Sequence, residues 1–107
     1  MDKISFRLEG FEGPLDVLLS LINKHKLDIF NVEISELLKQ YMAFMEECHE
    51  NNLELAGEFL EMASRLIYIK TASLLPQPEI AEKMKKELEG SLIEYSLCKV
   101  ASARLAE

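Results

Sequence analysis

The residues best suited to chemistry lie in the middle of the chain, where Cys48 is followed directly by His49. A thiol next to an imidazole could form a nucleophile–base pair. Adjacent residues on a helix, however, point about 100° apart, so these two side chains cannot share the hydrogen bond that such a pair requires. We therefore predict that Cys48 is a core thiol and that His49 is a surface imidazole.

A metal site is the second possibility that these residues raise. Glu46 and His49 have the Glu-x-x-His spacing that ferritin-like helical bundles use to hold iron. Such a site needs two of these motifs together with carboxylates from two further helices, and this sequence has only one motif. We therefore predict no metal and no cofactor for the chain by itself, and a metal-binding bundle completed by a second chain stays open as an alternative.

The carboxylates of the chain do not form a catalytic pair. Glu54, Glu58, Glu61 and Arg65 fall on one narrow polar strip of a predicted helix. Arg65 lies four residues after Glu61, which suits an ion pair on a solvated surface. The four glycines are scattered and make no phosphate-binding loop. Nothing in the sequence predicts an enzyme.

Composition sets further limits on the class of protein. The chain has 107 residues, enough for one domain or a fragment of a longer protein, and a net charge of −7 that argues against direct binding of nucleic acid. Four acidic residues among the first twenty exclude a signal peptide, and no apolar run reaches the roughly 18 residues that cross a membrane. The two isolated cysteines suggest reduced, buried thiols. We expect a soluble, cytoplasmic protein that does not bind membranes.

The first half of the chain contains one predicted strand and two predicted helices. Apolar and polar residues alternate over Ile4–Leu8, which predicts a half-buried strand or extended arm whose partner is not apparent. Gly13 and Pro14 then suit the start of a helix over about Pro14–Lys24, which is apolar over more than half its circumference and so must be buried on more than one side. An ordinary amphipathic helix is predicted over about Ile34–Glu50.

The third predicted helix, over about Leu53–Leu75, has more apolar surface than one core contact uses. After Pro78 comes a polar stretch, Glu79–Glu89, and helical spacing then resumes towards the end of the chain. The second apolar stripe of the third helix could be covered by Ser91–Ala106 folding back, by another protein, or by a second copy of the chain. The predicted fold is all-α: a small bundle of three main helices plus a C-terminal helix.

The sequence resembles the amino-terminal domain of the ScpA family, the prokaryotic kleisin subunits of the SMC condensin complex. The resemblance rests on FEGPLDVLLSLINKHKLDIFNVEISELLKQYM and EFLEMASRLIYIKTASLLP, and it runs from Phe6 to Pro76 without an obvious gap. The later stretch LIEYSLCKVASARLAE is similar to the next helix of the family. One departure is Glu61, which stands where the family helix is expected to have an apolar residue.

The resemblance implies a non-enzymatic role in chromosome condensation and segregation, and thus in the cell cycle and cell division. In such kleisins the amino-terminal domain packs on the head-proximal coiled coil (neck) of SMC, the middle segment binds a dimer of ScpB, and DNA is held only indirectly through the nucleoid-associated complex. Residues 1–76 would then be the neck-binding domain. Residues 77–107 would be a polar linker and the start of a helix, and the segment after about Glu79 would lead to the ScpB-binding region. The residues expected to bind the neck are Leu60, Ala63, Ile67, Lys70 and Leu74, with Tyr41 and Met45 beside them.

Overall fold

The described part of the structure is a bundle of four helices. The computed structural model describes residues 10–50, 56–76 and 78–106, and these contain α2 (Pro14–Lys24), α3 (Ile34–Glu50), α4 (Gly57–Ser73) and α5 (Pro78–Ala106) and no strand. The all-α prediction is therefore confirmed. The predicted strand at Ile4–Leu8 lies outside the described residues.

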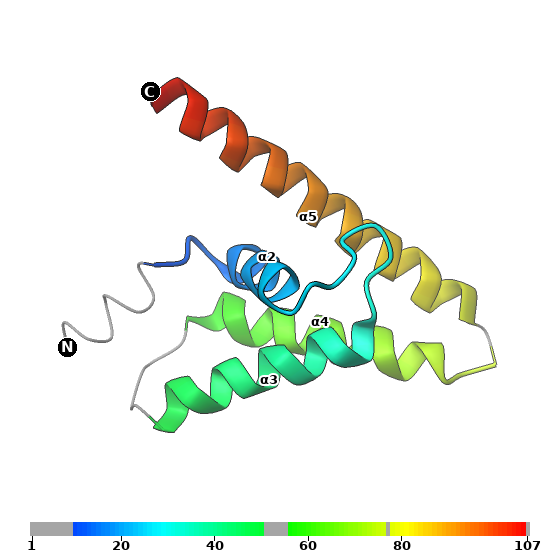
Figure 1. Cartoon of the computed structure of the whole chain (residues 1–107). Helices are drawn as coiled ribbons and strands as arrows, with labels where there is room; N and C mark the ends of the chain where they lie inside the picture. The colour runs from blue at the N-terminus through cyan, green and yellow to red at the C-terminus, as the bar shows by residue number, and fades with distance from the viewer. Residues whose placement is uncertain (1–9, 51–55, 77, 107) are drawn as a thin grey trace.

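The helix α2 begins and ends where the sequence predicts. The carbonyl of Gly13 accepts the N–H groups of Asp16 and Val17 at 3.1 and 3.2 Å, and Pro14 occupies the first turn, where its missing N–H costs nothing. Figure 1 shows α2 between α5 and the hairpin that α3 and α4 form. A helix covered on two sides needs an apolar surface on both, which explains why Val17, Leu18 and Ile22 are all buried.

The helices α3 and α4 form an antiparallel hairpin. The limits of α3 agree with the prediction, whereas α4 is shorter than predicted at both ends. Ala56 has an extended backbone, with φ −65° and ψ 155°, so α4 begins at Gly57 and not at Leu53. At the other end, Pro76 disfavours a helical conformation for the residue before it, so the helix ends at Ser73 and not at Leu75.

The predicted polar linker after Pro76 is instead helical. The helix α5 runs without a break from Pro78 through Gly90 to Ala106. Residues 79–89 are mostly Glu, Lys, Ala, Leu and Met, which are good helix formers, and Gly90 costs only about 1 kcal/mol relative to Ala inside a helix. The periodic residues Ala81, Leu88 and Leu92 are buried, so the first half of α5 is part of the bundle.

One core joins all four helices. The first half of α5 packs along α4, and this packing covers part of the surplus apolar surface of α4. The residues of α5 that cover α4 lie within 81–92. One of the predicted arrangements had Ser91–Ala106 covering this surface instead. The fully buried side chains include Leu18, Ile22, Leu37, Tyr41, Leu66, Ile69, Leu88 and Leu92.

The two cysteines differ in exposure. Cys48 is buried in the core and His49 is exposed, as predicted. Cys98 is also exposed, which corrects the expectation that both thiols are buried. It lies in the second half of α5, which contacts the start of α2 through Tyr95 and Lys99 and is otherwise largely exposed, so Cys98 is left at the surface.

Candidate protein-binding surface

The hairpin of α3 and α4 is held together by a buried hydrogen bond. The hydroxyl of Tyr41 donates to the carbonyl oxygen of Phe59 at 2.8 Å. Burial raises the pKa of Tyr41 above its ordinary value of 10.0, and the nearby Cys48 and Glu58 raise it further by smaller amounts. The hydroxyl therefore keeps the proton that it donates. Tyr41 therefore fixes how α3 lies against α4.

The side of α4 that faces away from α5 carries a line of large apolar side chains. Leu60, Ile67 and Leu74 are spaced by seven residues, which is nearly two helical turns, and they are 52%, 45% and 79% exposed. A different side of α4 contacts α5, because Tyr68 and Ala72, which point about 100° and about 140° away from Ile67, line a pocket together with Ile80. The line of Leu60, Ile67 and Leu74 therefore lies on the side of α4 that borders α3.

The helix α3 contributes methionines to the same side. Phe44 packs edge-on against Phe11, with ring centroids 5.8 Å apart, and it lines a groove with residues of α2. At about 100° per residue, Met42 and Met45 point about 160° and about 100° away from Phe44, so they face away from the groove that Phe44 lines with α2. Met42 is 44% exposed and Met45 is half-buried.

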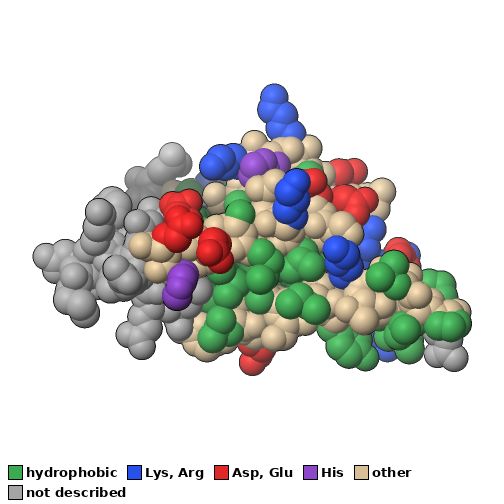
Figure 2. Space-filling model, turned by 90° about the horizontal axis from the view of Figure 1, so that it is seen from below, with side chains coloured by type: hydrophobic (Ala, Val, Ile, Leu, Met, Phe, Trp, Pro, Cys, Tyr) green, Lys and Arg blue, Asp and Glu red, His purple; other side chains and the backbone are tan. Residues whose placement is uncertain are grey.

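We call these five residues, Met42, Met45, Leu60, Ile67 and Leu74, the lower face. Figure 2 views the molecule from below and shows hydrophobic side chains gathered over α3 and α4, with more of them towards the corner between α4 and α5. Large contiguous apolar areas are uncommon on isolated proteins and mark surfaces that bind other molecules. The lower face is therefore the candidate functional site.

The residues predicted from the sequence divide into two groups. Leu60, Ile67, Lys70 and Leu74 are exposed and Met45 is half-buried, so these five are available to a partner. Ala63 and Tyr41 are buried in the bundle and do not reach the surface. Glu61 lies away from the lower face, in the pocket described below, so its departure from the family pattern does not alter this surface.

Sequence reasoning missed the corner between α4 and α5. A pocket of about 240 Å³ is lined there by apolar residues, and Tyr68, Leu75 and Ile80 are all more than 45% exposed. Tyr68 follows Ile67 and is one of the polar-tipped aromatic residues that favour interfaces. Its position on the surplus arc of α4 could have identified it from the sequence. Ile80 lies in the stretch predicted to be a polar linker, where it forms a thin apolar stripe with Met84 and Leu88.

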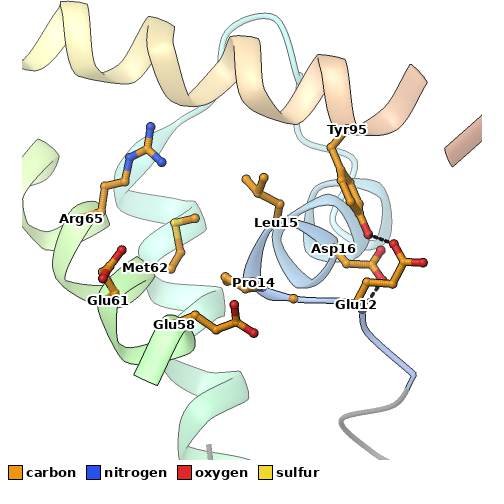
Figure 3. A pocket seen from close by; sticks show the side chains of 10 residues that line it. Glu12, Pro14, Leu15, Asp16, Glu58, Glu61, Met62, Arg65 and Tyr95 are labelled. Atoms are coloured by element: carbon orange, nitrogen blue, oxygen red, sulfur yellow. Dashed lines mark hydrogen bonds between the residues drawn. The ribbon is translucent and has the colours of Figure 1, made fainter. Parts of the chain in front are cut away.

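A second pocket, of about 370 Å³, lies between the start of α2 and the helices α4 and α5 (Figure 3). Glu58, Glu61 and Arg65 line it from α4, and Tyr95 lines it from α5. The predicted ion pair between Glu61 and Arg65 is not among the salt bridges of the described residues. In Figure 3 the carboxylates of Glu58 and Glu61 point in different directions.

The start of α2 is tied to α5 by two polar contacts that the sequence did not reveal. Asp16 is buried; it accepts the N–H of Glu12 at 3.0 Å and binds the ammonium group of Lys99 at 2.7 Å. The hydroxyl of Tyr95 donates to Glu12 at 2.5 Å (Figure 3). Partial burial and this hydrogen bond raise the pKa of Tyr95 above its ordinary value. The Lys99 partner of Asp16 is 83 residues away in the sequence, so local sequence patterns do not indicate this contact.

Two other functions, metal binding and membrane insertion, find no support in the described part of the chain. Residues 10–50, 56–76 and 78–106 contain no group of three or more His, Cys, Asp or Glu side chains that could hold a metal ion. Glu46 and His49 are both exposed on α3. Among the described helices, none has the length and apolar character needed to span a membrane.

Comparison with known proteins identifies the chain as one of a family. Residues 21–99 match the family model of segregation and condensation protein ScpA. The protein of that name from Streptococcus equi subsp. equi is 42% identical over 108 residues, which cover 96% of this chain and 46% of the relative. That from Bacillus cytotoxicus is 38% identical over 112 residues, covering 96% and 45%, and that from Mycoplasma mobile is 39% identical over 111 residues, covering 100% and 45%.

These relatives extend well beyond the region compared, because the chain spans slightly less than half of their length. The family match nevertheless covers most of the chain, including α3, α4 and the part of α5 that packs on the bundle. The resemblance inferred from the sequence is therefore confirmed, and the chain belongs to the ScpA family of segregation and condensation proteins.

Proposed function

We propose that this chain is part of a non-enzymatic kleisin subunit that docks on the neck of SMC through the lower face. Two lines of evidence support the proposal. Family membership supports an SMC complex as the setting, and the exposed apolar line of α4 supports a helical protein as the partner. The single observation that carries the proposal is the exposure of Leu60 and Ile67 on α4 and of Leu74 directly after it, although the other side of this helix is packed in the core.

The spacing of these residues suits a coiled coil in particular. A coiled coil repeats its surface every seven residues, and the lower face repeats at the same interval along α4. A partner helix lying beside α4 could thus meet Leu60, Ile67 and Leu74 with equivalent positions. Full burial of a Leu or Ile side chain contributes about 1.5–3 kcal/mol, so burial of the exposed half contributes about 1 kcal/mol for each residue.

The other expected residues support this surface in different ways. Lys70 is exposed, and its long stem can lie along apolar groups while its ammonium group stays in water. Tyr41 and Ala63 act from beneath, because they fix the packing of α3 against α4 without contacting the partner.

Binding to a fragment of SMC that contains the head and neck tests the proposal. We expect a one-to-one complex in size exclusion with light scattering, and we expect Ile67→Glu to abolish it, because a carboxylate would be buried in the contact. Leu97→Glu is the matched control: Leu97 is 65% exposed on α5 and lies outside the lower face. Circular dichroism checks that both variants stay folded.

Equal loss of binding in both variants, or no loss in either, would contradict the proposal. A tight homodimer of the chain that does not bind SMC would instead assign the lower face to self-association. Stoichiometric metal in elemental analysis of that dimer would favour the metal-binding alternative.

The proposal extends to the other partners of such a complex. We propose that the segment after about Glu79 contributes to binding ScpB, which is supported by the exposed Leu97, Val100 and Leu105 at the end of α5. Contact with DNA would be indirect, in keeping with the net charge of −7. The complex would act in chromosome condensation and segregation, in the cytoplasm at the nucleoid.

A further inference from the structure

We infer that the lower face selects the direction in which its partner helix docks. Its two ends carry opposite charge, so they fit a helix that is basic at one end and acidic at the other. This inference rests on the proposed function and specifies the chemistry of the SMC segment that docks. The basic residues of that segment would lie over the end of α3 near Glu46 and Glu50. Its acidic residues would lie over Lys39 and Lys70.

The cationic end is defined by one lysine from each helix. Lys70 lines a small groove with Ile34 and Ser35, so the last turn of α4 lies beside the first turn of α3. Lys39 is one helical turn beyond Ser35 on the same helix, and both lysines are exposed. The lysines are therefore at the end of the hairpin where α3 begins and α4 ends.

The opposite end of the hairpin is acidic. Glu46 and Glu50 are exposed on the last turns of α3. No Lys or Arg occurs between Glu46 and Glu61, so that part of the sequence supplies no cation to neutralise them. Glu46, Glu50, Lys39 and Lys70 are all exposed, and none of them belongs to the two ion pairs found among the described residues.

The two ends are far enough apart to act separately. Lys39 and Glu50 are eleven residues apart on one helix, which corresponds to about 16 Å at 1.5 Å per residue. This exceeds the Debye length of about 8 Å at physiological ionic strength, so the two charges do not cancel over the surface between them. Met42 lies between Lys39 and Glu50 along α3 and is 44% exposed, so apolar surface separates the two charges.

This order of charge selects direction more than it adds affinity. An apolar stripe with a seven-residue repeat accepts a helix in either direction, and it also accepts one displaced by a repeat. Opposite charges at the ends penalise the reversed arrangement, because it places like charges together. The partner chemistry follows: a helix with Lys or Arg near one end of its contact and Asp or Glu near the other.

The experiment reverses the order of charge and leaves the net charge unchanged. One variant carries Lys39→Glu, Lys70→Glu, Glu46→Lys and Glu50→Lys. The matched control carries Lys83→Glu, Lys86→Glu, Glu87→Lys and Glu94→Lys on α5, at exposed positions that lie outside the lower face and outside the groove lined by Lys70. Affinity for the SMC head-and-neck fragment is measured for both variants and for the unaltered chain, at about 50 mM and about 1 M salt. Circular dichroism confirms that each variant is folded.

We expect the lower-face variant to bind about tenfold more weakly at low salt, and the control to bind as the unaltered chain does. The difference should largely vanish at about 1 M salt, where the Debye length is about 3 Å. Equal affinity of the two variants at low salt, with Ile67→Glu still abolishing binding, would overturn this inference and leave the proposed function standing. Unaltered binding by Ile67→Glu would overturn both.

Discussion

The position of Leu92 allows a direct test of whether α5 belongs to the folded core. Leu92 is fully buried and lies beyond Gly90, in the region that was predicted to follow a linker. Leu92→Ala removes roughly three methyl-sized groups at about 0.8 kcal/mol each, or about 2.5 kcal/mol. The cavity that remains adds to this cost, so we expect about 3 kcal/mol in total, within the usual range for Leu→Ala in a core.

The same helix supplies the control. Leu97 lies five residues later and is largely exposed, so Leu97→Ala should change the free energy of unfolding by less than about 0.5 kcal/mol. A domain of this size is stable by about 5–15 kcal/mol, so the loss at Leu92 is a large fraction of the total. The two substitutions therefore differ in their outcome although they remove the same atoms from neighbouring turns.

Urea unfolding followed by circular dichroism measures the difference. We expect a single transition in each case, with the midpoint lowered for Leu92→Ala and the dependence on urea unchanged. A Leu92→Ala variant as stable as Leu97→Ala would refute the reasoning. So would a separate early transition with the amplitude of one long helix, because α5 would then unfold independently of α2, α3 and α4.

Two further substitutions test how α5 is held. Glu89 is buried and accepts the N–H of Val32 at 2.7 Å. Glu89→Ala should therefore lower the free energy of unfolding by about 1–3 kcal/mol and speed hydrogen exchange of the Val32 amide. Glu89→Gln keeps an acceptor oxygen and should lower the free energy of unfolding less. An unchanged exchange rate in Glu89→Ala would contradict this contact. Gly90 is exposed inside α5, and a Cβ added there would have open space around it. Gly90→Ala should therefore raise the free energy of unfolding, measured by calorimetry, by about 0.5–1 kcal/mol. A loss of stability would show that the helix is bent or strained at this position.

Local signals were sufficient for the elements with strong apolar periodicity. The limits of α2 and α3 were predicted correctly, because Gly13 and Pro14 mark a start and because both helices have apolar residues at helical spacing. The error at α5 came from giving weight to Gly90 and to the charge of residues 79–89. Three buried residues, Ala81, Leu88 and Leu92, are enough to place that polar helix on α4, and a thin stripe of this kind is difficult to distinguish from a linker without the partner surface.

The candidate site was predictable in part for a similar reason. Helical spacing identified α4 as a helix with surplus apolar surface, which is a property of α4 alone. It did not decide which part of the surplus α5 would cover, since this depends on packing between residues far apart in sequence. Ala63 was therefore included although it is buried, and Tyr68 was left out although it is exposed. The contact of Asp16 with Lys99 is of the same long-range kind.

The packing of α4 bears on how the lower face would bind. The residues Phe59, Met62, Leu66 and Ile69 hold α4 in the core, and α5 packs along the side that borders Ala72. The apolar line of Leu60, Ile67 and Leu74 is thus presented by a helix whose buried side is already fixed in the bundle. Association then orders only the exposed side chains, and the entropic cost of forming the binding helix has been met during folding. If the lower face docks as proposed, α5 would contribute indirectly, because its packing on another side of α4 from Leu60 and Ile67 would hold the lower face in place before the partner binds.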